Sequence, residues 1–126
     1  MEDWHIASTG IWTKAGLPAG EKAREVAREM GVNLDEHKST PLSLDLLEKS
    51  KLVITMESGQ KEAIRHEFTN QASKVIMLSE LAGNTIEIED PIGLNPNKTS
   101  EVLGIIDRLI REHFHDICSM AAKGLN

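Results

Sequence analysis

The sequence has a single cysteine, no tyrosine, two phenylalanines and two tryptophans among its 126 residues. The lone Cys118 excludes an intramolecular disulfide framework and any CxxC metal or redox motif, and it indicates a reducing compartment, which we expect to be the cytoplasm. Basic residues are also scarce, because 14 Lys and Arg stand against 20 Asp and Glu and leave a net charge of −6. This balance argues against nucleic acid or an anionic membrane surface as a partner.

Long hydrophobic runs are missing as well. The longest uninterrupted apolar stretch, residues 75–78, has four residues, whereas a membrane-spanning helix needs about 20. Residues 1–5 contain neither the basic stretch nor the apolar core of a secretory signal. We therefore expect a chain without a membrane segment.

Motifs for cofactors and metals do not occur. The chain contains no GxxxxGK[ST], GxGxxG or GxSxG pattern. The sequence therefore has no motif for phosphate-loop nucleotide binding, for dinucleotide binding or for the nucleophile elbow of serine hydrolases. None of the five histidines has the spacing of a metal-ligand set, and His113 and His115 project from different sides of a helix. We expect no cofactor and no metal, and we expect His113 to be a core histidine.

The residues that are present predict one α/β domain over residues 1–126. A chain of 13.9 kDa buries roughly two thirds of its unfolded surface, enough for one core without disulfides or metals. Two short β-branched runs, residues 52–56 and 75–78, predict buried parallel strands, and residues 4–8 are a weaker third candidate. Helical patterns lie between them, as in a three-layer open sheet with helices on both faces.

Helical periodicity predicts four helices, at residues 19–30, 43–50, 58–68 and 99–120. Gly31 offers a C-terminal stop for the first of them. Ser43 and Ser58 can each accept a hydrogen bond from the first turn of the second and third helices. The last helix keeps one apolar stripe through about six turns, so we expect it to lie across the sheet as a single long element.

Residues 81–98 contain Gly, Pro and Asn too densely for a helix or a central strand, and we expect a long functional loop beyond the carboxyl ends of the strands. Within it, Pro91 restricts Asp90 to an extended geometry and so directs its carboxylate. Such a group is a general acid if burial, a bound phosphate or Glu89 raises its pKa. An acidic, solvated loop with a turn-forming Asp-Pro pair is the other interpretation of the same residues.

Cys118 is the one candidate for a cysteine nucleophile. A lone cysteine can act in this way when a helix N-terminus, a cation or a histidine stabilises its thiolate. Cys118 lies late in the last expected helix, and the residues after it supply neither a glycine-rich cradle nor an arginine six positions on. We therefore expect a structural thiol.

Several short motifs occur in an order and at spacings that are typical of one family. They are Ala7-Ser8-Thr9-Gly10-Ile11-Trp12, Gly16-Leu17-Pro18-Ala19, Gly31-Val32-Asn33-Leu34, His37-Lys38-Ser39, Pro41-Leu42, Leu52-Val53-Ile54-Thr55-Met56 and Asp90-Pro91. Over nearly the whole chain they resemble the low-molecular-weight protein tyrosine phosphatases, and most closely the bacterial branch that includes protein-arginine phosphatases. The acid loop of that branch reads Asp-Pro-aromatic-Gly, where this chain has Ile92 in place of the aromatic residue.

The resemblance implies a flavodoxin-like sheet of strand order 2-1-3-4. It implies hydrolysis of phosphotyrosine or phosphoarginine in a phosphorylated protein substrate, through a phosphocysteine intermediate. It also implies that Asp90 is the catalytic acid, which would protonate the departing tyrosine oxygen or arginine nitrogen and then help to activate the hydrolytic water.

The chain departs from the family at its beginning. Family members begin with a buried central strand, a Cys-x5-Arg-Ser phosphate loop and a first helix, and none of these precedes residues 4–8 here. That loop carries the thiolate, the backbone N–H groups and the arginine that hold the phosphoryl group. We therefore expect an N-terminally truncated domain, without the first strand and first helix, that has no phosphocysteine-based activity alone. Two unpaired strand edges would remain, which favours a homodimer or a larger assembly.

Two other functions are possible on the same scaffold. One is a non-catalytic binding or oligomerisation module that uses the phosphatase scaffold to hold a partner. The other is thioredoxin-coupled arsenate reduction on the same scaffold, which needs further cysteines beyond the nucleophile. The segment just after Met56 contains none of them, so this function is set aside.

Overall fold

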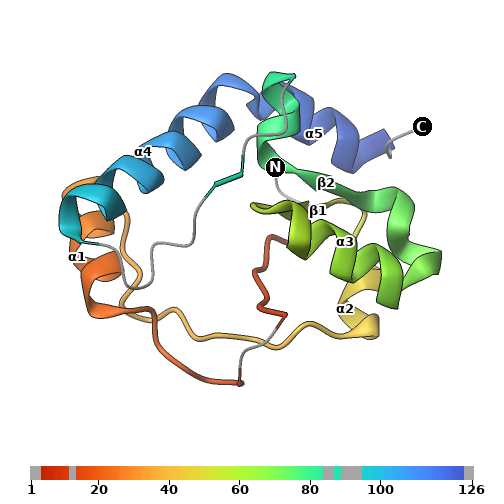
Figure 1. Cartoon of the computed structure of the whole chain (residues 1–126), viewed down its shortest axis with the longest axis horizontal. Coiled ribbons are helices and arrows are strands. Elements are labelled where there is room, and N and C mark those ends of the chain that lie inside the picture. The colour runs from red at the N-terminus through yellow and green to blue at the C-terminus, as the bar shows by residue number, and fades with distance from the viewer. Residues whose placement is uncertain (1–3, 12–13, 84–86, 89–94, 124–126) are drawn as a thin grey trace.

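Helices and two short strands alternate along the chain in the computed structural model, which describes residues 4–11, 14–83, 87–88 and 95–123. The elements in chain order are α1 (Glu21–Glu29), α2 (Leu44–Lys49), β1 (Val53–Thr55), α3 (Ser58–Glu67), the 3-10 helix η1 (Thr69–Lys74), β2 (Val75–Met77), the 3-10 helix η2 (Leu78–Ala82), α4 (Pro96–Glu112) and α5 (Phe114–Lys123). Figure 1 shows β1 and β2 side by side, with α3 and α4 on different sides of them. No helix in the described part of the chain is long and apolar enough to cross a membrane.

The sheet consists of β1 and β2, which run parallel. Val53 is paired with Val75, and the register continues through Thr55 and Met77. The Thr55 hydroxyl also donates a hydrogen bond of 3.1 Å to the main-chain oxygen of Ile76 on the neighbouring strand. Both strands lie within the runs predicted from the sequence, so that prediction is confirmed.

Helices cover both faces of this sheet. On one face Val75 is buried together with Leu47 of α2 and Ile64 of α3. On the other face Ile54 packs against a buried cluster that includes Val102 and Leu109 of α4. The molecule is therefore an α/β fold of three layers, and α1 extends one side of it by packing against α4.

The first two predicted helices are confirmed with small changes of their ends. α1 ends before Gly31, which has a φ of 82°, a left-handed conformation that favours glycine. α2 begins after Ser43, whose hydroxyl accepts a hydrogen bond of 3.2 Å from the backbone N–H of Leu46. Local capping chemistry is enough to place these ends.

The N-cap of α3 was wrongly predicted as Ser58. Glu57 is the cap, and the side chain of Gln60 accepts hydrogen bonds from the backbone N–H groups of Met56 (3.0 Å) and Glu57 (3.2 Å). This reciprocal capping box satisfies helix-end donors that a serine alone would leave open. Ser58 is thereby free to donate hydrogen bonds to another partner, Glu87.

The prediction of one long C-terminal helix was also wrong. The helix breaks at His113, whose φ of −114° and ψ of 19° end α4, and α5 starts at Phe114. The His113 Nδ1 atom lies 3.6 Å from the carboxylate of Asp116, so this side chain spans the break between the helices. His113 is 22% exposed in its side chain, and it is therefore a partly buried residue at a helix junction rather than a fully buried core histidine.

The loop predicted over residues 81–98 is shorter than expected. Its beginning belongs to η2, and its end belongs to α4, which starts at Pro96. Asn95 caps α4 by accepting a hydrogen bond of 2.9 Å from the backbone N–H of Lys98, and proline at the first helical position suits this arrangement. The Asn95-Pro96 pair is thus a helix start and not a turn.

The candidate strand at residues 4–8 does not form a strand. These residues are exposed, and Ile6 is 80% exposed. A strand needs a neighbour for its backbone groups, and no described residue pairs with residues 4–9. Pairing begins only at Gly10, which forms an isolated parallel bridge with Pro41.

Candidate active site

The carboxyl end of β1 leads directly into α3, and hydrogen bonds hold this junction. The side chain of Gln60 accepts hydrogen bonds from the backbone N–H groups of Met56 and Glu57, and the second of these belongs to the capping box. The backbone N–H of Ser58 follows at the start of the helix. Helix N-termini offer unpaired N–H groups and a partial positive charge, which favour an acidic partner.

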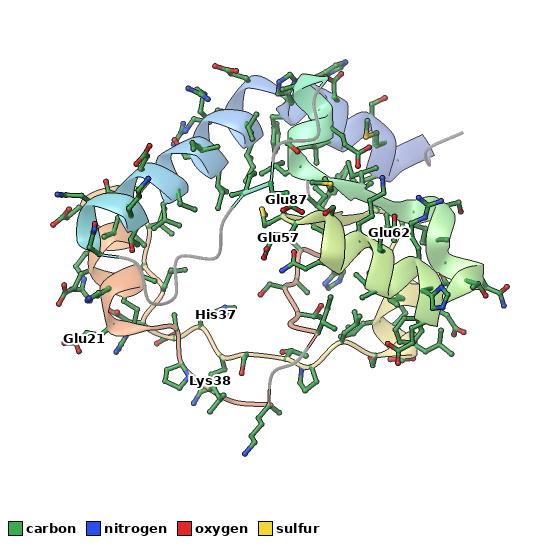
Figure 2. All side chains as sticks on the ribbon, viewed as in Figure 1. Glu21, His37, Lys38, Glu57, Glu62 and Glu87 are labelled. Atoms are coloured by element: carbon green, nitrogen blue, oxygen red, sulfur yellow. The ribbon has the colours of Figure 1, made fainter. Side chains whose placement is uncertain are left out.

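That acidic partner is Glu87. Its carboxylate accepts a hydrogen bond of 2.8 Å from the backbone N–H of Ser58 and a second one from the Ser58 hydroxyl. Figure 2 shows Glu57 and Glu87 close to each other where α3 begins. The contact joins two segments that are 29 residues apart in the sequence.

The next residue, Ile88, completes the attachment. Its backbone N–H donates a hydrogen bond of 3.0 Å to the main-chain oxygen of Met56. Its side chain is 4% exposed and belongs to the buried cluster between the sheet and α4 that contains Leu78, Val102 and Leu109. We call residues 87–88 the loop anchor, because three hydrogen bonds and the buried side chain of Ile88 hold them at the carboxyl end of β1.

Two carboxylates at this edge have lowered pKa values. The hydroxyl and the backbone N–H of Ser58 stabilise the ionised form of Glu87 and lower its pKa. The Lys61 ammonium, 2.7 Å from Glu80, and the backbone N–H of Met77 lower the pKa of Glu80 in the same way. Both groups are ionised at neutral pH, and a general acid must be protonated there, so neither carboxylate fits that role.

Asp90, the predicted catalytic residue, lies outside the described residues, as do Glu89 and Pro91. It follows the loop anchor by two positions in the sequence. The structure thus describes the attachment point of the predicted acid loop. That attachment was not predicted from the sequence.

Cys118 and the histidines form no candidate catalytic or metal site. Cys118 is a free, partly buried thiol inside α5, beyond the first turn of that helix. Throughout the described ranges, no group of three or more His, Cys, Asp or Glu side chains is placed to hold a metal ion.

An open pocket of about 180 Å³ is a second feature that the sequence did not indicate. Its lining residues are Ser8, Thr9, Gly10, His37, Ser39 and Thr40. The Ser39 hydroxyl accepts a hydrogen bond of 2.9 Å from the backbone N–H of Leu17 and donates one to the main-chain oxygen of Lys14, so it serves the local turn. In Figure 2, His37 lies well apart from Glu57 and Glu87.

Comparison with known proteins decides the family. The family model described as "Low molecular weight phosphotyrosine protein phosphatase" matches residues 1–123. The chain belongs to this family. The resemblance inferred from the short motifs is therefore confirmed, and the loop anchor lies in a low-molecular-weight phosphatase domain.

Individual relatives span both chemistries of the family. The chain is 28% identical to the probable low molecular weight protein-tyrosine-phosphatase EpsP of Ralstonia nicotianae, over 82% of this chain and 70% of that protein. It is 27% identical to the protein-arginine-phosphatase of Bacillus subtilis, over 86% of this chain and 72% of that protein. The solved YwlE arginine phosphatase from Geobacillus stearothermophilus is similar in fold, with a TM-score of 0.88 at 21% identity over 100% of this chain and 82% of that one.

Proposed function

We propose that this chain is the scaffold of a phosphatase for phosphotyrosine or phosphoarginine in proteins, with Asp90 as its general acid. The observation that carries the proposal is the loop anchor. Residues 87–88 are fixed at the carboxyl end of β1, where ligands bind in open α/β sheets. A chain of two residues spans at most about 7 Å, and Asp90 follows Ile88 by two positions in the sequence.

The assignment of Asp90 also rests on elimination among neighbouring acids. Glu80 and Glu87 have lowered pKa values and are hydrogen-bond acceptors for the scaffold. A proton donor for a departing phenolate or guanidine nitrogen must instead carry its proton at neutral pH. Asp90 follows the anchor and precedes Pro91, which restricts its backbone.

We propose further that this polypeptide, by itself, forms no phosphocysteine. Cys118 is the sole cysteine, it lies inside α5, and the sequence after it offers no phosphate cradle. Assays with p-nitrophenyl phosphate and phosphoarginine should give no turnover above the buffer rate. Turnover that survives Cys118→Ala and is lost in Asp90→Asn would contradict this part of the proposal.

A test of the role of Asp90 requires a protein that contains a nucleophile. A chimera that carries ahead of this chain the Cys-x5-Arg-Ser segment with which, on the family resemblance, a relative such as that of Ralstonia nicotianae begins would supply one. In an active chimera, Asp90→Asn should lower kcat by about 10²-fold to 10⁴-fold, the usual contribution of a general acid, and remove the alkaline limb of the pH profile. Cys118→Ala is the matched control and should change neither. An Asp90→Asn chimera with unchanged kcat would refute the assignment.

A non-catalytic binding or oligomerisation module is the second candidate function. It is favoured by β1, which pairs with β2 on one side and with no strand on the other in the described part of the chain. Such a free edge supports self-association into a homodimer or larger assembly. Self-association without measurable affinity for phosphotyrosine or phosphoarginine peptides would favour this function. The single cysteine supports a reducing, cytoplasmic location for either function.

A further inference from the structure

The segment between β2 and α4 is held to one helix at two places. Ser58 and Lys61 are three positions apart on α3, so their side chains leave the same side of the helix. The Lys61 ammonium lies 2.7 Å from the carboxylate of Glu80 in η2, and Ser58 donates two hydrogen bonds to Glu87. One side of α3 thus holds both η2 and the loop anchor.

The two residues of the loop anchor are held in different ways. Ile88 is 4% exposed and belongs to the buried cluster beside α4, so a substitution there changes the packing of the core. Glu87 is exposed, and Figure 2 shows it where α3 begins. Its partner Ser58 is exposed as well. Removing the Glu87 carboxylate therefore breaks the polar contact of the loop anchor and leaves the buried cluster in place.

The loop anchor is the nearer of two held points on either side of Asp90. Ile88 precedes Asp90 by two positions, whereas Asn95, the cap of α4, follows it by five. A general acid must come within about 2.6–3.2 Å of the atom that it protonates, and a misplacement of about 1 Å can cost about 10²-fold in rate. We propose that Glu87, held by Ser58, is the residue that positions Asp90 within reach of the leaving group. This role rests on the proposed function, in which Asp90 is the general acid.

The first test needs no activity and uses this chain alone. The backbone N–H of Ile88, which donates to the main-chain oxygen of Met56, reports whether the loop anchor is closed. Glu87→Ala should speed hydrogen exchange at this N–H by about tenfold or more, as measured by NMR, because the anchor then opens more often. Glu87→Gln keeps an oxygen for both donors of Ser58 and should change the rate much less. The N–H of Phe68, bonded to Ile64 at the far end of α3, is the internal control.

The second test measures protonation of the leaving group in the active chimera. p-Nitrophenolate leaves readily as an anion, whereas phenolate, like the tyrosine side chain with a pKa of about 10, needs a proton from the acid. The ratio of kcat/KM for p-nitrophenyl phosphate to kcat/KM for phenyl phosphate therefore rises when the acid is lost or misplaced. Asp90→Asn should raise this ratio by about 10²-fold, Glu87→Ala by about tenfold, and Glu87→Gln by less than about twofold.

Ser50→Ala is the matched control for Ser58→Ala. Each substitution removes one hydroxyl that forms a hydrogen bond at the end of a helix, and the Ser50 hydroxyl donates to the main-chain oxygen of Leu46 in α2 at 2.7 Å. Ser58→Ala should raise the ratio of the two kcat/KM values, and Ser50→Ala should leave it unchanged. Circular dichroism melts of every variant show whether the domain is folded.

A double variant separates positioning from an independent effect. If Glu87 acts through Asp90, the variant with both Glu87→Ala and Asp90→Asn should have the same ratio as Asp90→Asn alone. Effects that multiply, or a ratio raised by Asp90→Asn and unchanged by Glu87→Ala, would overturn the positioning role and leave Asp90 as the acid. A ratio that Asp90→Asn does not change would refute the proposed function itself, and the positioning role with it.

Discussion

Two buried threonines differ in one respect that can be measured. Thr99, in the first turn of α4, is 0% exposed, and its hydroxyl has no hydrogen-bond partner among the described residues. Thr55, in β1, is 6% exposed, and its hydroxyl donates to the main-chain oxygen of Ile76. Valine has nearly the shape of threonine without the hydroxyl, so Thr→Val at both sites tests whether each hydroxyl is satisfied.

The two substitutions should change the free energy of unfolding with opposite signs. An unpaired buried hydroxyl costs about 1–3 kcal/mol, so Thr99→Val should raise the free energy of unfolding by about 1 kcal/mol or more. A paired one contributes about 0.5–1.5 kcal/mol net, so Thr55→Val should lower it by about 1 kcal/mol. Effects common to both, such as the gain of a buried methyl group, cancel in the difference of about 2 kcal/mol.

The assay is urea denaturation followed by circular dichroism, with thermal melts in parallel. For a domain of this size 1 kcal/mol corresponds to about 3–5 °C in Tm, so the variants should melt about 6–10 °C apart. Equal m-values would show that the denatured states are comparable. A Thr99→Val variant destabilised as much as Thr55→Val would mean that the Thr99 hydroxyl is paired after all, and it would refute the reasoning.

Two further predictions concern the carboxylates at the edge of the sheet. Ser58→Ala should raise the pKa of Glu87 toward its ordinary value, as measured by NMR titration, and an unchanged pKa would contradict the loop anchor. A carboxylate whose pKa is lowered by folding stabilises the folded state, and this stability is lost as the pH falls through that pKa. The variant should therefore lose stability less steeply on acidification. Lys61→Met should raise the pKa of Glu80 and lower the free energy of unfolding by about 1 kcal/mol, because the Lys61 and Glu80 side chains are only 19% and 32% exposed. Lys49→Met breaks the ion pair with Asp45, whose two side chains are 72% and 71% exposed. It should lower the free energy of unfolding by almost nothing in the same denaturation assay.

Elements fixed by local chemistry were predicted well from the sequence. The β-branched runs that became β1 and β2 are short and apolar, each follows a lysine, and each run supplies the strand that the other pairs with. Gly31 ends α1 because glycine adopts a positive φ at low cost, and Ser43 caps α2 through its own hydroxyl. These signals lie within a few residues of their effect, so the sequence pattern contains them.

Elements that depend on distant partners were predicted poorly. Residues 4–8 have the pattern of a strand, yet a strand exists only when a neighbour pairs with it. The apolar stripe of the last helix continues through His113, but the chain bends there and a side chain spans the junction to Asp116. Periodicity reports which face is buried and does not report whether the axis is continuous.

The candidate site divides in the same way. Asp90 was predicted from the adjacent Pro91 and from the resemblance to a family, both of which are visible in the sequence. The contact between Ser58 and Glu87 was not predicted, because the two residues are 29 positions apart and no sequence motif links them. The signal that could have suggested it is general: a helix N-terminus without an acidic residue in its first turn accepts a carboxylate from elsewhere.

The loop anchor has a structural value that is independent of catalysis. Ile88 is buried between the sheet and α4, so a change there disturbs the core, and Glu87 satisfies the first N–H group of α3. Selection for stability alone would therefore keep residues 87–88 in an active enzyme and in a non-catalytic scaffold alike. Asp90 is different, because its assigned role is a proton transfer and not a contact that holds the core. For that reason the Asp90→Asn chimera, and not the stability of the loop, is the measurement that separates a phosphatase from a binding module.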